Sequence, residues 1–141
     1  IDKFATTLVH EVITISDGDP FDSKDLDRGF SFIDESRNYR LNILVHCMAG
    51  VSRSPSLLAG YFMKIYSWNP LETLRFLVDK RHVIDPAPVT FNSVIQYVFG
   101  SNKQFICEKC HKEWIYKERF DQTHPKSNFF NYCNCFNPQI A

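Results

Sequence analysis

The sequence predicts an α/β domain, because short apolar runs with β-branched residues alternate with segments that carry apolar residues at helical spacing. Strands are expected within residues 4–16, before the turn-rich stretch Asp17-Gly18-Asp19-Pro20, and at residues 43–45. The chain of 141 residues is long enough for one moderate domain, or a smaller one with an appendage. Because composition changes after Gly100, we expect a domain at residues 1–100 and a tail at residues 101–141.

The segments around the second strand are expected to be helices. Asp22 and Ser23 offer an N-cap to a helix that runs to about Glu35. Asn69 and Pro70 open another helix as N-cap and first-turn proline. Spacing predicts four buried faces: Leu26, Phe30 and Ile33; Leu57, Leu58, Tyr61, Phe62 and Ile65 in the helix 54–66; Leu71, Leu74, Leu77 and Val78; and Phe91, Val94, Ile95 and Val98 before Gly100.

Residues 43–54, read as ILVHCMAGVSRS, contain a candidate reactive site. A strand, a tight loop and a helix N-terminus form an anion site, since the loop amides point inward and the helix dipole adds partial positive charge. Cys47 in such a ring is expected to be a thiolate and is the candidate nucleophile. Arg53 can present a bidentate fork to a phosphate, and Gly50 lets the backbone turn.

The same loop supplies the rest of the predicted site. Ser54 places a hydroxyl near the sulfur, where it can stabilise the thiolate as a leaving group. Phosphate oxygens are expected on the amides of the loop, namely Met48, Ala49, Gly50, Val51, Ser52 and Arg53. The pattern therefore predicts thiol–phosphate transfer. The alternative is a buried structural cysteine after a strand, with Arg53 as a surface charge.

The order His46-Cys47, five residues, then Arg53-Ser54 resembles the signature of the cysteine-dependent protein phosphatases. Residues 49–55, AGVSRSP, resemble the dual-specificity branch. The resemblance covers roughly residues 12–99 and implies a central, mostly parallel sheet flanked by helices. It also implies hydrolysis of phosphotyrosine and phosphoserine/threonine in phosphoproteins through a phosphocysteine intermediate, which needs no metal.

The resemblance also assigns a general acid. From spacing alone Asp17 belongs to a solvated turn, but dual-specificity phosphatases place their acid directly after such a strand, which implies Asp17 with Asp19 as the alternate. Residues 81–91, RHVIDPAPVTF, resemble a family loop but have Ala87 where asparagine is usual. Relatives carry a longer stretch before the acid, whereas 16 residues precede Asp17 and the chain opens on Ile1. We therefore expect a processed, shortened or abbreviated domain.

The tail carries two cysteine pairs, which predict a zinc site. Cys107 and Cys110 are spaced CxxC, and Cys133 and Cys135 are spaced CxC, with His111 and His124 as substitute ligands. Two thiolate pairs can close a tetrahedral zinc site, and the metal would supply folding energy to a tail with little core. Four buried thiols or two disulfides are the alternatives. A subset of dual-specificity phosphatases has a cysteine-rich zinc-binding domain after the catalytic one, which this tail resembles.

The composition of the chain limits the classes of partner and the cellular compartment that we expect. With 16 basic and 16 acidic residues the net charge is zero, so no overall field favours nucleic acid or membrane. No apolar run approaches the ~20 residues of a spanning helix, and no signal-peptide pattern opens the sequence. Five cysteines, one of them a candidate reactive thiol, fit a reducing compartment, the cytoplasm or nucleus, better than a disulfide framework. The alternative function is an inactive phosphate-binding module whose zinc tail contacts protein or ribonucleoprotein.

Overall fold

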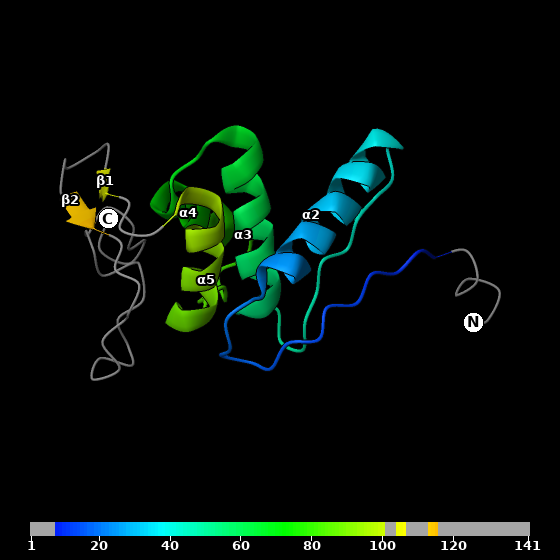
Figure 1. The fold of residues 1–141 in the computed structure, drawn as a ribbon, viewed down its shortest axis with the longest axis horizontal. Helices are drawn as coiled ribbons and strands as arrows, with labels where there is room; N and C mark the ends of the chain where they lie inside the picture. The colour runs from blue at the N-terminus through cyan, green and yellow to red at the C-terminus, as the bar shows by residue number, and fades with distance from the viewer. Residues whose placement is uncertain (1–7, 101–103, 107–112, 116–141) are drawn as a thin grey trace.

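A computed structural model of the chain describes residues 8–100, 104–106 and 113–115. Four helices make up most of the first range: α2 (Ser23–Asn38), α3 (Arg53–Tyr66), α4 (Pro70–Lys80) and α5 (Pro88–Phe99). Figure 1 shows α3 between α2 on one side and α4 and α5 on the other, and α3 contacts all three. No helix in the described part of the chain is both long and apolar enough to cross a membrane.

The helix ends follow the sequence signals. The side chain of Asp22 accepts a hydrogen bond from the amide of Lys24, which confirms the predicted N-cap of α2. At α4, Asn69 and Glu72 form a capping box: the Asn69 side chain accepts from the Glu72 amide at 2.8 Å, and the Glu72 side chain accepts from the Asn69 amide at 2.7 Å. Gly100 ends α5 with a φ of 83°, a conformation that glycine adopts without strain.

The core lies where α3 meets its neighbours. The predicted buried faces of α2, α4 and α5 are confirmed except at their ends: Val78 and Val98 are only partly buried against the core, whereas the other predicted residues are buried, namely Leu26, Phe30, Ile33, Leu71, Leu74, Leu77, Phe91, Val94 and Ile95. The predicted face of α3 is wrong at Ile65, which is exposed, whereas Ala59 and Met63 are buried. The reason is Gly60: a Cβ there would lie 2.3 Å from Val94 Cγ1 and 2.9 Å from Phe30 Cζ. Helices α5 and α2 therefore approach α3 at Gly60, which turns Ile65 outward.

The two predicted strands are extended segments without a strand partner. Their side chains alternate as in a strand: Ile13 and Ile15, like Ile43 and Val45, pack against the core, whereas Leu44 is 83% exposed. Among the described residues, no backbone hydrogen bond joins residues 9–15 to residues 42–47, and residues 8–100 contain no strand. The predicted central sheet is therefore not formed by these residues, because a sheet exists only through pairing between strands.

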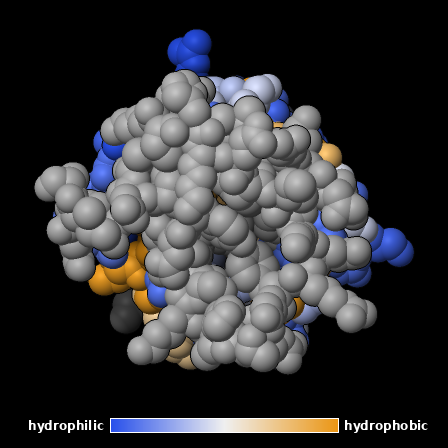
Figure 2. All heavy atoms as spheres, turned by 90° about the vertical axis from the view of Figure 1, so that its left-hand side faces the viewer, coloured by the Kyte–Doolittle hydropathy of each residue, from blue (hydrophilic) through white to orange (hydrophobic). Residues whose placement is uncertain are grey.

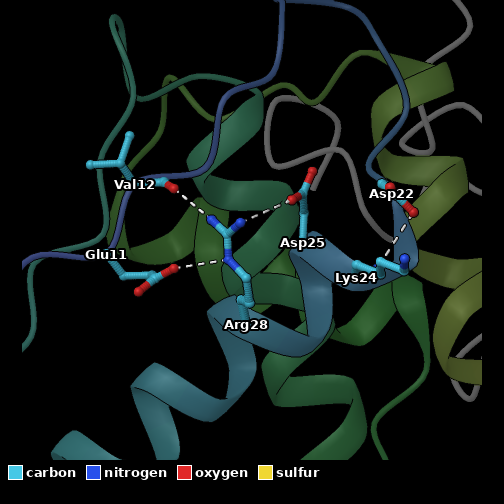
Figure 3. Close-up of polar contacts among 6 residues, drawn as sticks. All are labelled: Glu11, Val12, Asp22, Lys24, Asp25 and Arg28. Carbon is cyan, nitrogen blue, oxygen red and sulfur yellow. Dashed lines mark hydrogen bonds and ion pairs between the residues drawn. The ribbon is translucent and has the colours of Figure 1, made fainter.

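Arginine side chains from the helices hold the first extended segment in place. In Figure 3, Arg28 of α2 reaches the segment with two hydrogen bonds, from Nε to Glu11 Oε1 at 2.9 Å and from Nη2 to the carbonyl of Val12 at 2.6 Å. Arg28 Nη1 also lies 3.7 Å from Asp25 Oδ1 on its own helix. Further along, Arg53 Nη1 donates to the carbonyl of Ile15 at 3.1 Å. The segment is thus attached mainly through side chains of α2 and α3.

Beyond α5 the structure describes a short hairpin, β1 (Gln104–Ile106) and β2 (Glu113–Ile115). The two strands pair antiparallel, with Phe105 opposite Trp114. They fall within the segment that the sequence assigns to the tail. On the side of the molecule seen in Figure 2, the visible described atoms are a mixture of orange apolar and blue hydrophilic groups.

Candidate active site

The predicted phosphate loop connects the second extended segment to α3. Cys47 stands at the end of the segment, and Arg53 is the first residue of α3. Between them Gly50 has a φ of 69°, which lies in the left-handed region that glycine occupies at no steric cost. This turn brings backbone N–H groups of the loop toward the sulfur, and those of Ala49, Gly50 and Ser54 form hydrogen bonds with it. Three main-chain amides at this end of α3 are therefore directed at the sulfur, which is part of the arrangement that the sequence predicts.

The environment of Cys47 favours the thiolate. Burial raises the pKa of this thiol, but hydrogen bonds from the Ser54 hydroxyl and from the amides of Ser54, Gly50 and Ala49 together outweigh burial. The net effect lowers the pKa from its ordinary value of 9.0 to about 6. Cys47 Sγ and Ser54 Oγ lie 3.2 Å apart. At neutral pH the sulfur is thus mainly a thiolate that accepts hydrogen bonds, as a nucleophile must be.

Arg53 joins the loop to the predicted acid. Its Nη1 donates to the Ile15 carbonyl at 3.1 Å, and its Nε lies 3.8 Å from Asp17 Oδ1. The Asp17 side chain is 73% exposed, whereas that of Arg53 is 23% exposed. The structure therefore brings Cys47, Arg53 and Asp17 to one end of α3.

Asp19, the alternate acid, is held differently. The turn is closed by a hydrogen bond from the Asp19 amide to the Ser16 carbonyl at 3.1 Å. The Asp19 carbonyl in turn accepts from Thr90 Oγ1 of α5 at 2.8 Å. These contacts fix the backbone of the turn, and Asp17 is the residue of the pair that contacts Arg53.

Residues 81–87 lie against the outer side of the phosphate loop. The Asp85 amide donates to the Val51 carbonyl at 3.0 Å, and the Ala87 amide donates to Ser52 Oγ at 2.8 Å. The position where the family usually has asparagine thus contacts the loop through its main chain. From the sequence we expect this loop to pack near the phosphate site, but none of its residues was assigned a role there. The resemblance of residues 81–91 to a family loop was the only signal for them.

A cavity of about 250 Å³ opens beside the site, between the two extended segments. It is lined by Cys47, Arg53 and Ser54 together with His10, Glu11 and His46, and by apolar residues of α2 and α3. Along the second extended segment, Leu44 also lines another cavity of about 400 Å³. The loop and the candidate nucleophile Cys47 are therefore accessible from the side of the extended segments.

The predicted zinc ligands Cys107, Cys110, Cys133 and Cys135, and the substitutes His111 and His124, lie outside the described residues. Within residues 8–100, 104–106 and 113–115, no group of three or more His, Cys, Asp and Glu side chains is arranged to hold a metal ion.

Comparison with known proteins identifies the family. The model of the dual specificity phosphatase catalytic domain matches residues 12–98. This match covers more than half of the chain and includes the phosphate loop, Asp17 and residues 81–87. The chain belongs to the dual-specificity phosphatase family.

Individual relatives are phosphatases of diverse origin. The chain is 38% identical over 78 residues to the putative tyrosine-protein phosphatase R622 of Acanthamoeba polyphaga mimivirus, a match that covers 55% of this chain and 36% of that protein. It is 31% identical over 78 residues to the protein-tyrosine-phosphatase IBR5 of Arabidopsis thaliana, a match that covers 53% of this chain and 30% of that protein. With tyrosine-protein phosphatase yvh1 of Schizosaccharomyces pombe the identity is 32% over 91 residues, a match that covers 64% of this chain and 27% of that protein. The chain therefore spans about a third or less of each of these relatives.

A solved structure supports the fold. The structure of PTPMT1 in complex with PI(5)P superposes with a TM-score of 0.56 at 23% identity, covering 60% of this chain and 54% of that one. At this identity the likeness concerns the fold alone. It supports a cysteine-phosphatase fold for the helices and the loop, although residues 8–100 form no sheet.

Proposed function

We propose that the chain hydrolyses phosphate monoesters of phosphorylated proteins, at phosphotyrosine and phosphoserine/threonine, through a phosphocysteine. The observation that carries this proposal is Cys47, whose pKa is lowered to about 6 by the hydroxyl and amides of the loop that leads into α3. The family and the names of the relatives support the reaction class.

In the first step, Cys47 Sγ attacks phosphorus and forms an S–P bond, while the P–O bond to the substrate breaks. Asp17 in its protonated form gives its proton to the leaving oxygen. The loop amides and the guanidinium of Arg53 bind the three remaining phosphate oxygens, where negative charge gathers in the transition state. For this, Arg53 turns its donors from Ile15 and Asp17 toward the phosphate.

In the second step, water attacks the phosphocysteine and Asp17, now a carboxylate, accepts its proton. The S–P bond breaks and the thiolate of Cys47 leaves. Ser54 Oγ, 3.2 Å from the sulfur, donates a hydrogen bond that stabilises the thiolate as it forms. Phosphate is released and the enzyme returns to its starting state.

Hydrolysis of a generic aryl phosphate by the purified chain and by Cys47→Ser tests the proposal. We expect turnover by the parent chain, a phosphocysteine that can be trapped by acid quenching, and no turnover above background by the variant. An inactive parent chain that still binds phosphopeptide would favour the alternative of a phosphate-binding module. Undiminished hydrolysis by Cys47→Ser would contradict the mechanism.

We propose further that Cys107, Cys110, Cys133 and Cys135 hold one structural zinc ion and that the protein works in the cytoplasm or nucleus. The support is the spacing of the cysteine pairs and the use of a free thiol. Metal analysis of reduced protein should give about one zinc per chain, bound at Zn–S distances of ~2.3 Å. Cys133→Ser should lower the zinc content, whereas Cys47→Ser should keep it. A reduced sample without zinc would contradict the proposal.

A further inference from the structure

Arg81 is bound to the outside of the phosphate loop by its side chain. Its Nη2 donates to the Ala49 carbonyl at 3.2 Å, and its Nε donates to the Gly50 carbonyl at 3.3 Å. The residue itself is the C-cap of α4, where its amide donates to the Leu77 carbonyl at 2.9 Å. The side chain of Arg81 thus extends from the end of α4, and its guanidinium binds two consecutive carbonyls of the loop.

The direction of each of these two carbonyls fixes the direction of the amide that follows it in the loop. In a planar trans peptide, the C=O of one residue and the N–H of the next point in opposite directions. The carbonyl of Ala49 and the amide of Gly50 therefore lie at opposite ends of one rigid unit. Arg81 binds the carbonyl end, and the amide end forms a hydrogen bond with the sulfur of Cys47. One peptide group connects Arg81 to the nucleophile.

The next peptide groups repeat the arrangement. Arg81 also binds the Gly50 carbonyl, and the Asp85 amide binds the Val51 carbonyl. The amides of Gly50, Val51 and Ser52 are therefore turned to the side opposite these contacts. A positive charge at the carbonyl end also polarises the peptide, which makes its N–H a stronger donor. Arg81 is thus placed both to orient the loop amides and to strengthen them.

We propose that Arg81 is a positioning residue for the phosphoryl transfer: by holding the Ala49 and Gly50 carbonyls outward, it aims the Gly50 and Val51 amides at the thiolate and at the phosphate. This inference rests on the proposed function and extends it to a residue that touches no reacting atom. Arg81 acts from behind the loop, whereas Arg53 lines the cavity with Cys47.

Other charged or titratable groups also surround Cys47, and the test leaves them unchanged. His10, Glu11 and His46 line the same cavity, and Asp17 Oδ1 lies 3.8 Å from Arg53 Nε. On the outer side of the loop, Asp85 belongs to the same segment as Arg81 and binds through its amide.

The experiment measures the acidity of Cys47 directly. Iodoacetamide alkylation of Cys47, followed by peptide mapping between pH 4.5 and 9, is compared in the parent chain, Arg81→Met, Arg81→Lys and Lys80→Met. In Arg81→Met we expect an upward shift of the midpoint by about half to one unit, equivalent to a three- to tenfold loss of thiolate at acidic pH. Protection of Cys47 by inorganic phosphate should weaken by about the same factor. The midpoint in Arg81→Lys should lie between those of the parent chain and Arg81→Met, since a point charge cannot bind both carbonyls as a fork does.

Lys80→Met is the matched control, because it removes one positive charge from the neighbouring position. The Lys80 ammonium lies over the Phe76 ring, 5.4 Å from its centroid. In Lys80→Met, the midpoint of Cys47 alkylation and the protection of Cys47 by phosphate should equal those of the parent chain. If circular dichroism shows that Arg81→Met is poorly folded, the proposal is tested by comparing the alkylation midpoints and phosphate protection of the parent chain and Arg81→Lys. An unchanged midpoint and unchanged protection in the folded variants would overturn the proposal. Alkylation does not require turnover, so this outcome is distinct from a failure of the proposed hydrolysis.

Discussion

The nucleophile and the acid belong to two parts of the molecule that are anchored in different ways. Cys47 sits in a loop that leads into α3, whose buried face is packed against α4 and α5. Asp17 follows an extended segment that is held to the helices by hydrogen bonds from Arg28 and Arg53 and by the packing of Ile13 and Ile15, and whose outward face is open to solvent. In the proposed reaction, phosphate binding and nucleophilic attack therefore depend on the packing of the helices, while proton transfer depends on how the first extended segment is held.

The largest expected effect falls on the acid. Asp17→Asn should slow hydrolysis of alkyl phosphates by about 10²–10⁴-fold, the usual contribution of a positioned proton donor. Aryl phosphates should be affected less, because their leaving oxygen needs less protonation, and the alkylation of Cys47 should not change. Steady-state rates on both substrate types measure this. Equal losses on both would argue against Asp17, and a selective loss in Asp19→Asn would move the role to that residue.

The acidic side of the pH profile should report the Cys47 thiol together with the substrate phosphate, whose second pKa is about 6. Because the folded-state pKa of Cys47 is about 6, below its ordinary value of 9.0, the thiolate persists down to about pH 6. Below that pH, protonation of the thiolate should lower kcat/KM by about tenfold per pH unit, in addition to the loss caused by protonation of the substrate phosphate. The contribution of the thiolate to stability is complete above pH 9 and is lost as the pH falls through about 6. A rate that still rises steeply from pH 7 to 9 would contradict this interpretation.

A pair of glycine substitutions compares the packing of the two parts. Gly60→Ala places a methyl group 2.3 Å from Val94 Cγ1, a stiff β-branched side chain between helices, and should destabilise the fold by about 1–3 kcal/mol. In Gly29→Ala the new Cβ meets the ends of Leu57 at 2.8 Å and Ile13 at 3.2 Å, which can move. There the gain of about 1 kcal/mol in helix propensity should offset most of the strain. Urea midpoints at unchanged slope measure both, and equal shifts would show that the two parts are equally rigid.

The smallest effect is expected from the anchor of the acid-bearing segment. Arg28→Met removes the hydrogen bonds to Glu11 and Val12 seen in Figure 3. The loss should lower the turnover of alkyl phosphates about two- to fivefold, the rate equivalent of the ~0.5–1 kcal/mol that an exposed ion pair contributes. Asp25→Asn, which removes only the contact within α2, is the control. A similar loss on aryl phosphates would place the effect outside the proton transfer.

The helices and the loop could be predicted from the sequence because their signals are local. Capping residues such as Asp22 and Asn69 mark the helix starts, and apolar spacing marks most of the buried faces. The exposure of Ile65 could not be predicted, since it depends on which helices approach Gly60. The lack of pairing between the two extended segments could not be predicted either, because it depends on which segments lie side by side in the folded chain. For the same reason Arg81 was missed: it binds main-chain carbonyls, and every residue has one.

The unpaired second extended segment has a consequence for hydrogen exchange. Among the described residues, the amides of residues 42–46 have no hydrogen-bond partner, so deuterium should replace their protons almost as fast as in an unfolded peptide. From Ser56 onward, where the amide donates to the Ser52 carbonyl at 2.9 Å, the amides belong to α3 and should exchange far more slowly. Cys47 therefore lies at a boundary between the fastest and the slowest exchanging parts of the domain. A peptide map of deuterium uptake should show this boundary within the phosphate loop itself.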